Sequence, residues 1–249
     1  APEAPLQVIP ARPEPLRVTQ EGGDVVLRFP FPSKTVQGTP LTNLTRVTVL
    51  REIVPSPAGA RAPDPPAEAA DPERAEKLFR QRAEAVRDLP RESLDEFTVG
   101  SELVVRDPML PLFAEKRLGR VLLRYGVTAT RDRRRVSPLS PLVSIAPKVP
   151  PAEPVALQAT VEEGRVCLEW LPPVGMLDGS TPVSVAGYAV YRREEAEDAY
   201  GDWVGVAGRS PFVDSGVVAG KRYVYTVRAA PSPDLPPVLG PAADEVVAD

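Results

Sequence analysis

The sequence predicts an all-β protein built from two tandem β-sandwiches, and two matching stretches carry that prediction. Residues 220–229 (GKRYVYTVRA) form a turn followed by strict alternation, in which Tyr223, Tyr225 and Val227 point to one side. Such alternation is typical of a strand with one face on a core and the other in water. Residues 119–129 (GRVLLRYGVTA) repeat the pattern more weakly. Two copies about a hundred residues apart predict two similar domains.

The proline content favours short strands and ordered loops. The 249 residues include 32 prolines, where roughly 5%, or about 12, are expected. Proline has no amide hydrogen to donate, so it is excluded from central strands and from helix interiors. Low Asn, Cys, Met and His contents beside many Pro and Arg residues fit a thermophile or a GC-rich genome.

Composition argues against several classes of function. A net charge of −4 with mixed signs argues against a nucleic-acid binder. Histidine, the commonest general base and metal ligand, is absent. The one cysteine, Cys167, lies in an apolar strand pattern and cannot form an internal disulfide. We therefore expect neither a metal nor a cofactor.

The chain divides into four expected parts. Residues 1–13 form a Pro-rich, extended leader. Residues 14–147 form the first sandwich, which carries a Pro/Ala-rich helical insertion at about 55–96. Residues 148–153 are a short, stiff linker, and residues 154–249 form the second sandwich.

Short β-rich runs bounded by turns predict the strands of both sandwiches. Those of the first sandwich lie at residues 15–19, 25–29, 44–53, 97–99, 103–105, 119–129 and 142–145. Those of the second lie at residues 155–161, 166–170, 187–192, 203–206, 212–214, 223–229 and 242–247.

The insertion holds one expected amphipathic helix. Asp71-Pro72-Glu73 supplies an N-cap, a proline at the first helical position and an acid in the first turn. Apolar residues follow at helical spacing, so Leu78 and Phe79 are expected to pack on a sheet. Pro90 is expected to end the helix. In the alternative, the helix stops near Arg82 and residues 85–89 form a strand.

The second half resembles fibronectin type III domains. Trp170 precedes two prolines, as the core tryptophan of strand B does in that family, and residues 187–192 (GYAVYR) resemble strand C. Residues 217–223 resemble the turn into strand F, with Tyr223 at the tyrosine corner. The resemblance implies that its hydroxyl bonds a backbone group a few residues upstream.

The first half is similar at fewer positions. Four residues match counterparts in the second half: Phe29 with Trp170, Asp107 with Asp214, Tyr125 with Tyr225 and Val127 with Val227. Leu123 stands where Tyr223 does, so we expect apolar packing from Leu78 and Phe79 to replace the corner hydroxyl. The layout also resembles bacterial envelope lipoproteins that carry two such domains behind a Pro-rich leader.

No catalytic constellation is predicted. The acids nearest strand ends do not pair in sequence as a glycosidase requires; they are Asp107, Glu169, Asp178 and Asp214. Ser137 and Ser140 have no histidine to activate them.

Seven residues are candidates for interaction instead. Tyr200 and Trp203 lie near an expected loop and could stack on a sugar or anchor a protein, with Tyr200 the more exposed and Trp203 covering the sheet edge. The arginine cluster could meet phosphate, lipid headgroups or an acidic protein, or be a solvated hairpin tip; it includes Arg133, Arg134 and Arg135. Leu78 and Phe79 represent the insertion, whose other interpretation is an edge-covering helix.

The function expected from these features is non-enzymatic. We expect a secreted, periplasmic or outer-membrane-associated bacterial protein that scaffolds or binds a protein partner, reaching the membrane only through an N-terminal lipid anchor. The alternative is an accessory carbohydrate-binding module of a polysaccharide-degrading system. The sequence contains no transmembrane run or signal peptide and begins Ala1-Pro2, so a processed or trimmed N-terminus is expected.

Overall fold

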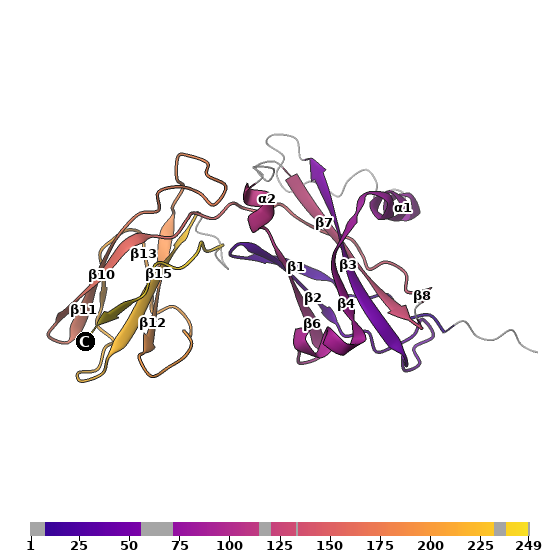
Figure 1. Ribbon diagram of the computed structural model, residues 1–249, viewed down its shortest axis with the longest axis horizontal. Coiled ribbons are helices and arrows are strands. Elements are labelled where there is room, and N and C mark those ends of the chain that lie inside the picture. Colours follow the sequence, from indigo (N-terminus) through magenta and orange to yellow (C-terminus); the bar gives the residue numbers. More distant parts are fainter. Residues whose placement is uncertain (1–7, 56–71, 115–120, 133, 232–237, 249) are drawn as a thin grey trace, which may run out of the picture. The chain divides into compact units, whose positions relative to one another are not determined.

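The computed structural model describes residues 8–55, 72–114, 121–132, 134–231 and 238–248 (Figure 1). The chain divides into two compact units, one built mainly from residues before Lys148 and the other mainly from Lys148 onward. Each unit contains a β-sandwich, and the all-β prediction is confirmed.

The second sandwich consists of a three-stranded and a four-stranded sheet. The first sheet has the order β10-β11-β14 and the second β13-β12-β15-β16. Their bounds are β10 Val155–Glu162, β11 Arg165–Leu171, β12 Gly187–Glu194, β13 Gly205–Ala207, β14 Phe212–Asp214, β15 Tyr223–Ala230 and β16 Val246–Ala248. This is the A-B-E and C′-C-F-G order of the fibronectin type III fold, with β15 as strand F.

Strand β15 points its alternating aromatic face into the core, as predicted. Tyr225 and Val227 are fully buried and pack in one cluster with Leu168 and Trp170. The tyrosine corner is also confirmed, because the Val218 N–H donates to the Tyr223 hydroxyl at 3.1 Å.

The prediction that the other face of β15 lies in water is wrong. Val224 and Thr226 are both buried. Residues 238–243 fold over this outer face: the Thr226 hydroxyl donates to the Ala243 carbonyl at 2.8 Å, and Leu239 packs against Ala230.

The first sandwich repeats this topology. One sheet has the order β1-β2-β6-β5 and the other β4-β3-β7-β8, with β9 also pairing with β7. Their bounds are β1 Arg17–Glu21, β2 Asp24–Pro30, β3 Leu44–Pro55, β4 Glu84–Pro90, β5 Thr98–Val99, β6 Glu102–Pro108, β7 Val121–Arg131, β8 Arg135–Val136 and β9 Val143–Ile145. The strand orders of the two sandwiches match. In one sheet, the counterparts of β10, β11 and β14 are β1, β2 and β6. In the other sheet, the counterparts of β13, β12 and β15 are β4, β3 and β7.

The insertion contains a shorter helix than the main prediction gave. Helix α1 (Pro72–Arg82) begins at the predicted proline but ends at Arg82, and Glu84–Pro90 form strand β4, as the alternative had it. Pairing with β3 satisfies the backbone of this segment and places Leu89 opposite Val47, both buried. Pro90 begins a 3-10 helix (Arg91–Phe97) instead of ending α1. The Pro/Ala-rich residues 56–71 lie outside the described residues.

Helix α1 packs on the outer face of the first sandwich, next to β7 (Figure 1). Phe79 is fully buried, and its ring lies 3.1 Å from where a Cβ at Gly126 would stand. A side chain at position 126 would therefore require the Phe79 ring and the Leu139 and Leu142 side chains to shift. Arg82 also reaches Glu52 of β3 at 3.6 Å. The expected packing of Phe79 on the sheet is confirmed, whereas Leu78 is half-buried.

One short helix was not predicted. Helix α2 covers Leu110–Ala114, directly after β6. Its Phe113 is fully buried, and the Phe113 N–H donates to the Met109 carbonyl at 2.9 Å.

Candidate functional site

An Arg–Asp–Tyr triad, in which the aspartate and the tyrosine are buried and the arginine is half-buried, links the two sheets of the second sandwich. Asp214 of β14 accepts hydrogen bonds at Oδ2 from Arg192 Nη1 at 2.7 Å and from the Tyr225 hydroxyl at 2.9 Å. Its Oδ1 accepts the Gly216 N–H at 2.8 Å. Arg192 and Tyr225 are direct cross-strand partners on β12 and β15.

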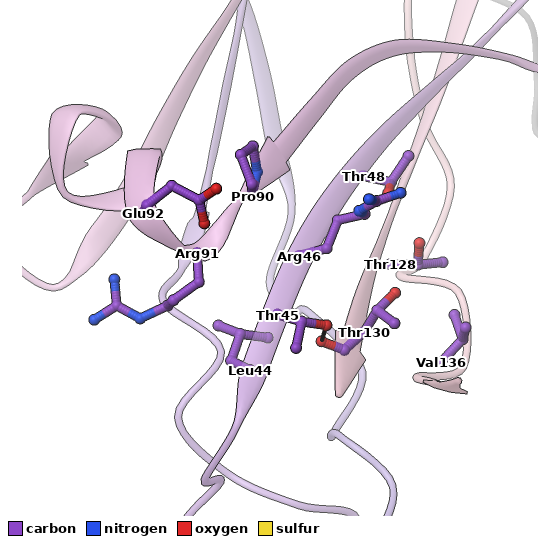
Figure 2. A pocket seen from close by; sticks show the side chains of 10 residues that line it. All are labelled: Leu44, Thr45, Arg46, Thr48, Pro90, Arg91, Glu92, Thr128, Thr130 and Val136. Carbon is purple, nitrogen blue, oxygen red and sulfur yellow. Dashed lines mark hydrogen bonds between the residues drawn. The ribbon is translucent and has the colours of Figure 1, made fainter. Parts of the chain in front are cut away.

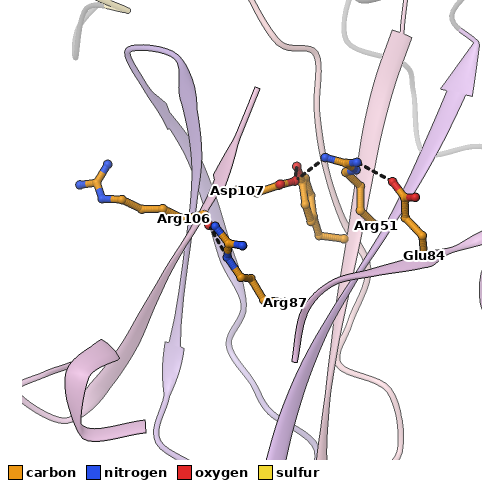
Figure 3. A network of polar contacts seen from close by, with 6 residues as sticks. Arg51, Glu84, Arg87, Arg106 and Asp107 are labelled. Atoms are coloured by element: carbon orange, nitrogen blue, oxygen red, sulfur yellow. Dashed lines mark hydrogen bonds and ion pairs between the residues drawn. The ribbon is translucent and has the colours of Figure 1, made fainter. Parts of the chain in front are cut away.

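The first sandwich has the same triad at the same place in its topology. Asp107 of β6 accepts from Arg51 Nη1 and from the Tyr125 hydroxyl, both at 2.8 Å. Arg51 and Tyr125 are cross-strand partners on β3 and β7. Arg51 also donates to Glu84 Oε1 at 2.5 Å, so its guanidinium joins β3 to β4 as well (Figure 3).

These triads are structural rather than catalytic. Burial, reinforced by the neighbouring aspartate, raises the pKa of Tyr125 and of Tyr225 far above the usual range for a phenol. Both phenols therefore stay protonated and act only as donors. Asp107 and Asp214 are both buried, with about 5% of their surface exposed.

Sequence reasoning paired the aspartates and the tyrosines but missed the arginines. The signal was present: Val47, Val49 and Arg51 alternate along β3, which points the arginine inward like the valines. An inward-facing arginine needs an acid partner, and the matched Asp107 was available.

The outer face of the second sandwich carries a second, more accessible cluster, which we call the tyrosine–arginine face. It consists of Tyr191, Arg193, Tyr200, Arg228 and Glu245. The Tyr191 and Tyr200 rings meet edge to face at 6.3 Å. Arg228 lies 5.7 Å from the Tyr191 ring centre, and Arg193 lies 5.4 Å from that of Tyr200. The two tyrosines thus lie side by side between two arginines on one surface, and tyrosine and arginine are side chains that often contribute strongly to binding.

Glu245 fixes one end of this face. It accepts from the Tyr200 hydroxyl at 2.9 Å and pairs with Arg193 at 3.0 Å. Burial and this carboxylate raise the pKa of Tyr200 to about 12. Tyr200 therefore stays protonated at neutral pH, and its ring is held in a fixed orientation by Arg193 and Glu245.

The relative exposure of the two predicted aromatics is the reverse of the expectation. Trp203 is 40% exposed, whereas Tyr200 is half-buried because Tyr191, Arg193 and Glu245 surround it. Trp203 therefore has the more accessible ring of the two.

The other predicted interaction residues are scattered. Phe79 is buried under α1 and cannot meet a partner, so it is withdrawn as an interaction residue. Arg134 and Arg135 are exposed at the β8 turn, and Arg133 lies outside the described residues. The two serines Ser137 and Ser140 are buried and accept N–H groups of β7, so their hydroxyls serve the fold.

A polar groove of about 730 Å³ lies on the outer face of the first sandwich (Figure 2). It is lined by Leu44, Thr45, Arg46, Thr48, Pro90, Arg91, Glu92, Thr128, Thr130 and Val136. Two of its hydroxyls are already engaged, since Thr48 donates to Asp88 and Thr45 to the Thr130 carbonyl. Arg46 pairs with the same Asp88 at 3.1 Å. A polar ligand in the groove would therefore have to replace these contacts or bind beside them.

The described residues contain no group of three or more His, Cys, Asp or Glu side chains that could hold a metal ion. None of their helices is long and apolar enough to cross a membrane.

Comparisons with known proteins find similarity at the level of solved structures. No family model and no curated protein matches the chain. A Fn3-like protein from Clostridium thermocellum aligns at 22% identity over 39% of this chain and 90% of that chain, with a TM-score of 0.31. The FN1–FN3 domains of chicken CNTN1 align at 13% identity over 97% of this chain, with a TM-score of 0.41, and the alignment covers 65% of that chain. The fold assignment rests on the strand order and buried side chains described above.

Proposed function

We propose that the protein is a non-catalytic interaction module whose tyrosine–arginine face, together with Trp203, which follows Tyr200 closely in the chain, binds a protein partner. The observation that carries the proposal is the arrangement of two tyrosines between two arginines on the outer face of one sheet. Tyrosine, tryptophan and arginine are the residues most enriched at the energetic centres of protein interfaces.

Pre-organisation supports this assignment. The Tyr200 ring is fixed by Arg193 above it and by Glu245 at its hydroxyl. A side chain that is already ordered loses little conformational entropy on binding. The Trp203 ring, at 40% exposure, supplies apolar area that a partner can bury.

We further propose that the protein acts in the cell envelope or outside the cell of a bacterium, held by an N-terminal anchor. The end of the Pro-rich leader belongs to the first sandwich instead of forming a free spacer, because the Ala11 N–H donates to the Lys34 carbonyl at 2.9 Å and the Val36 N–H to the Ile9 carbonyl at 3.0 Å. The chain has one cysteine, Cys167, and its thiol is half-buried and free. The fold therefore needs no internal disulfide bond and is compatible with both the cell envelope and the extracellular space. Sequencing the precursor's N-terminus tests this: a signal peptide that ends in a cysteine just before Ala1 would establish a lipoprotein, and a cytoplasmic start there would contradict it.

Photo-crosslinking tests the proposed face directly. A photoreactive phenylalanine analogue at position 203 is expected to capture a defined partner from envelope fractions. The matched control places the analogue at Val161, which is 51% exposed on a strand of the other sheet. Equal capture of the same protein from both positions would contradict the assignment to this face.

A carbohydrate-binding role is the second candidate, favoured by the exposed Trp203, since aromatic rings can stack on sugars. A glycan array with the wild-type chain and the variants Tyr200→Ala and Trp203→Ala separates the two functions. Binding of a glycan that both variants abolish would support this role, and an array without signal would eliminate it.

A further inference from the structure

The edge strand β13 has one side without a strand partner among the described residues. It ends the sheet β13-β12-β15-β16 and pairs only with β12. The backbone N–H and C=O groups along a free edge can pair with another strand, and native proteins usually protect such edges with charges or proline.

Strand β13 lacks this protection, although its counterpart in the first sandwich has it. Strand β4 carries three charged residues and ends in Pro90. By contrast, residues 203–208 (WVGVAG) contain no charge and no proline. Val206 is 66% exposed and Val204 37% exposed. The edge therefore presents β-branched apolar side chains beside open backbone groups.

The strand is also held in a fixed conformation from its inner side. A Cβ at Gly205 would lie 2.4 Å from the Phe212 ring, so this ring packs directly on the glycine backbone. The neighbouring Ala207 is buried in the core cluster. An incoming strand would thus meet a preformed template.

We propose that β13 pairs with β13 of a second copy of this chain, antiparallel and about a two-fold axis near Gly205. The two four-stranded sheets would then form one continuous eight-stranded sheet. The charges at the two ends of the strand favour pairing with a second copy of the chain, because exposed Asp202 precedes β13 and exposed Arg209 follows it. Antiparallel pairing brings Asp202 of each copy toward Arg209 of the partner subunit, whereas parallel pairing would bring like charges together.

The size of the edge sets the strength of the dimer. Three strand residues extend about 10 Å, and a stable interface usually buries about 1,200–2,000 Å². A contact built on β13 falls toward the small end of this scale. The dimer is therefore weak and dissociates on dilution.

Sedimentation equilibrium of the full chain over a range of concentrations tests the proposal. The wild-type chain is expected to pass from monomer to dimer. Val206→Lys places like charges on facing edges and should weaken dimerisation by about tenfold or more. Val206→Thr keeps the β-branch without a charge and should retain the dimer. Val247→Lys adds the same charge to the opposite edge strand of the sheet, β16, where Val247 is 42% exposed.

Each result of the sedimentation experiment either supports or overturns the proposed dimer. Loss of the dimer in Val206→Lys but not in Val247→Lys, with both variants unfolding like wild type, would support the proposal. A chain that stays monomeric at every concentration, or that loses its dimer equally in both lysine variants, would overturn it. No external partner takes part in this experiment, so its result is independent of the proposed function.

Discussion

Replacing Tyr225 by phenylalanine isolates one bond of the second triad. The ring is fully buried, and its hydroxyl donates to the Asp214 carboxylate at 2.9 Å. A hydrogen bond to a charged group contributes about 1.5–3 kcal/mol. Asp214 keeps its bonds from Arg192 and Gly216, so the variant leaves no charge unpaired. The cost should therefore stay below the roughly 3–5 kcal/mol of a broken buried ion pair.

Tyr223→Phe is the matched control, because it removes a hydroxyl from the same strand. That hydroxyl accepts a bond from a neutral backbone N–H at 3.1 Å, which contributes about 0.5–1.5 kcal/mol. Urea unfolding followed by circular dichroism measures the change in free energy for both variants. In a domain of this size each kcal/mol lowers the Tm by about 4–8 °C.

The expected order is a larger loss for Tyr225→Phe than for Tyr223→Phe. Tyr125→Phe, the equivalent change in the first sandwich, should cost as much as Tyr225→Phe, because the Asp107 bond is equally short. A Tyr225→Phe variant as stable as the wild-type chain, or more stable than Tyr223→Phe, would refute the role given to the triad.

Three further predictions concern α1, β13 and the tyrosine–arginine face. Phe79→Ala should cost about 3–5 kcal/mol and release α1, measurable as faster amide exchange in this helix, because an isolated helix this short is unstable. Gly205→Ala should cost about 1–3 kcal/mol by pressing a methyl group into the Phe212 ring, measurable by urea unfolding; an unchanged stability would mean that the ring can move. Folding raises the pKa of Tyr200 from about 10 to about 12, so the stability that Tyr200 contributes is complete below pH 10 and is lost as pH rises from about 10 to 12. The loss of stability across this pH range should therefore be smaller in Tyr200→Phe than in the wild-type chain, although the other tyrosines with raised pKa values keep part of it.

Local patterns explain why much of the fold could be predicted. The alternation in residues 220–229 is a property of adjacent residues, and it predicted strand β15. The corner bond of Tyr223 was implied by the resemblance of residues 217–223 to fibronectin type III domains. The start of α1 was equally local. The end of α1 could not be predicted from local residues, because Glu84–Pro90 form a strand only through pairing with β3.

Contacts between distant residues explain the errors at the surface. Thr226 is buried by Ala243, which lies 17 residues further along the chain. Tyr200 is half-buried because Glu245, 45 residues away, bonds its hydroxyl. The spacing of apolar and polar residues around Thr226 and around Tyr200 does not indicate these contacts. The inward-facing arginines of the triads are different, since the alternation of β3 and β12 already pointed them to the core.

The affinity of the captured partner for variants of the tyrosine–arginine face tests the central functional claim most directly. Isothermal titration calorimetry would compare the wild-type chain with Tyr200→Ala, Trp203→Ala and the control Val161→Ala. We predict that each aromatic variant weakens binding by at least about 1–2 kcal/mol, roughly fivefold to thirtyfold, while the control binds like wild type. Wild-type affinity in both aromatic variants would contradict the claim that this face binds the partner.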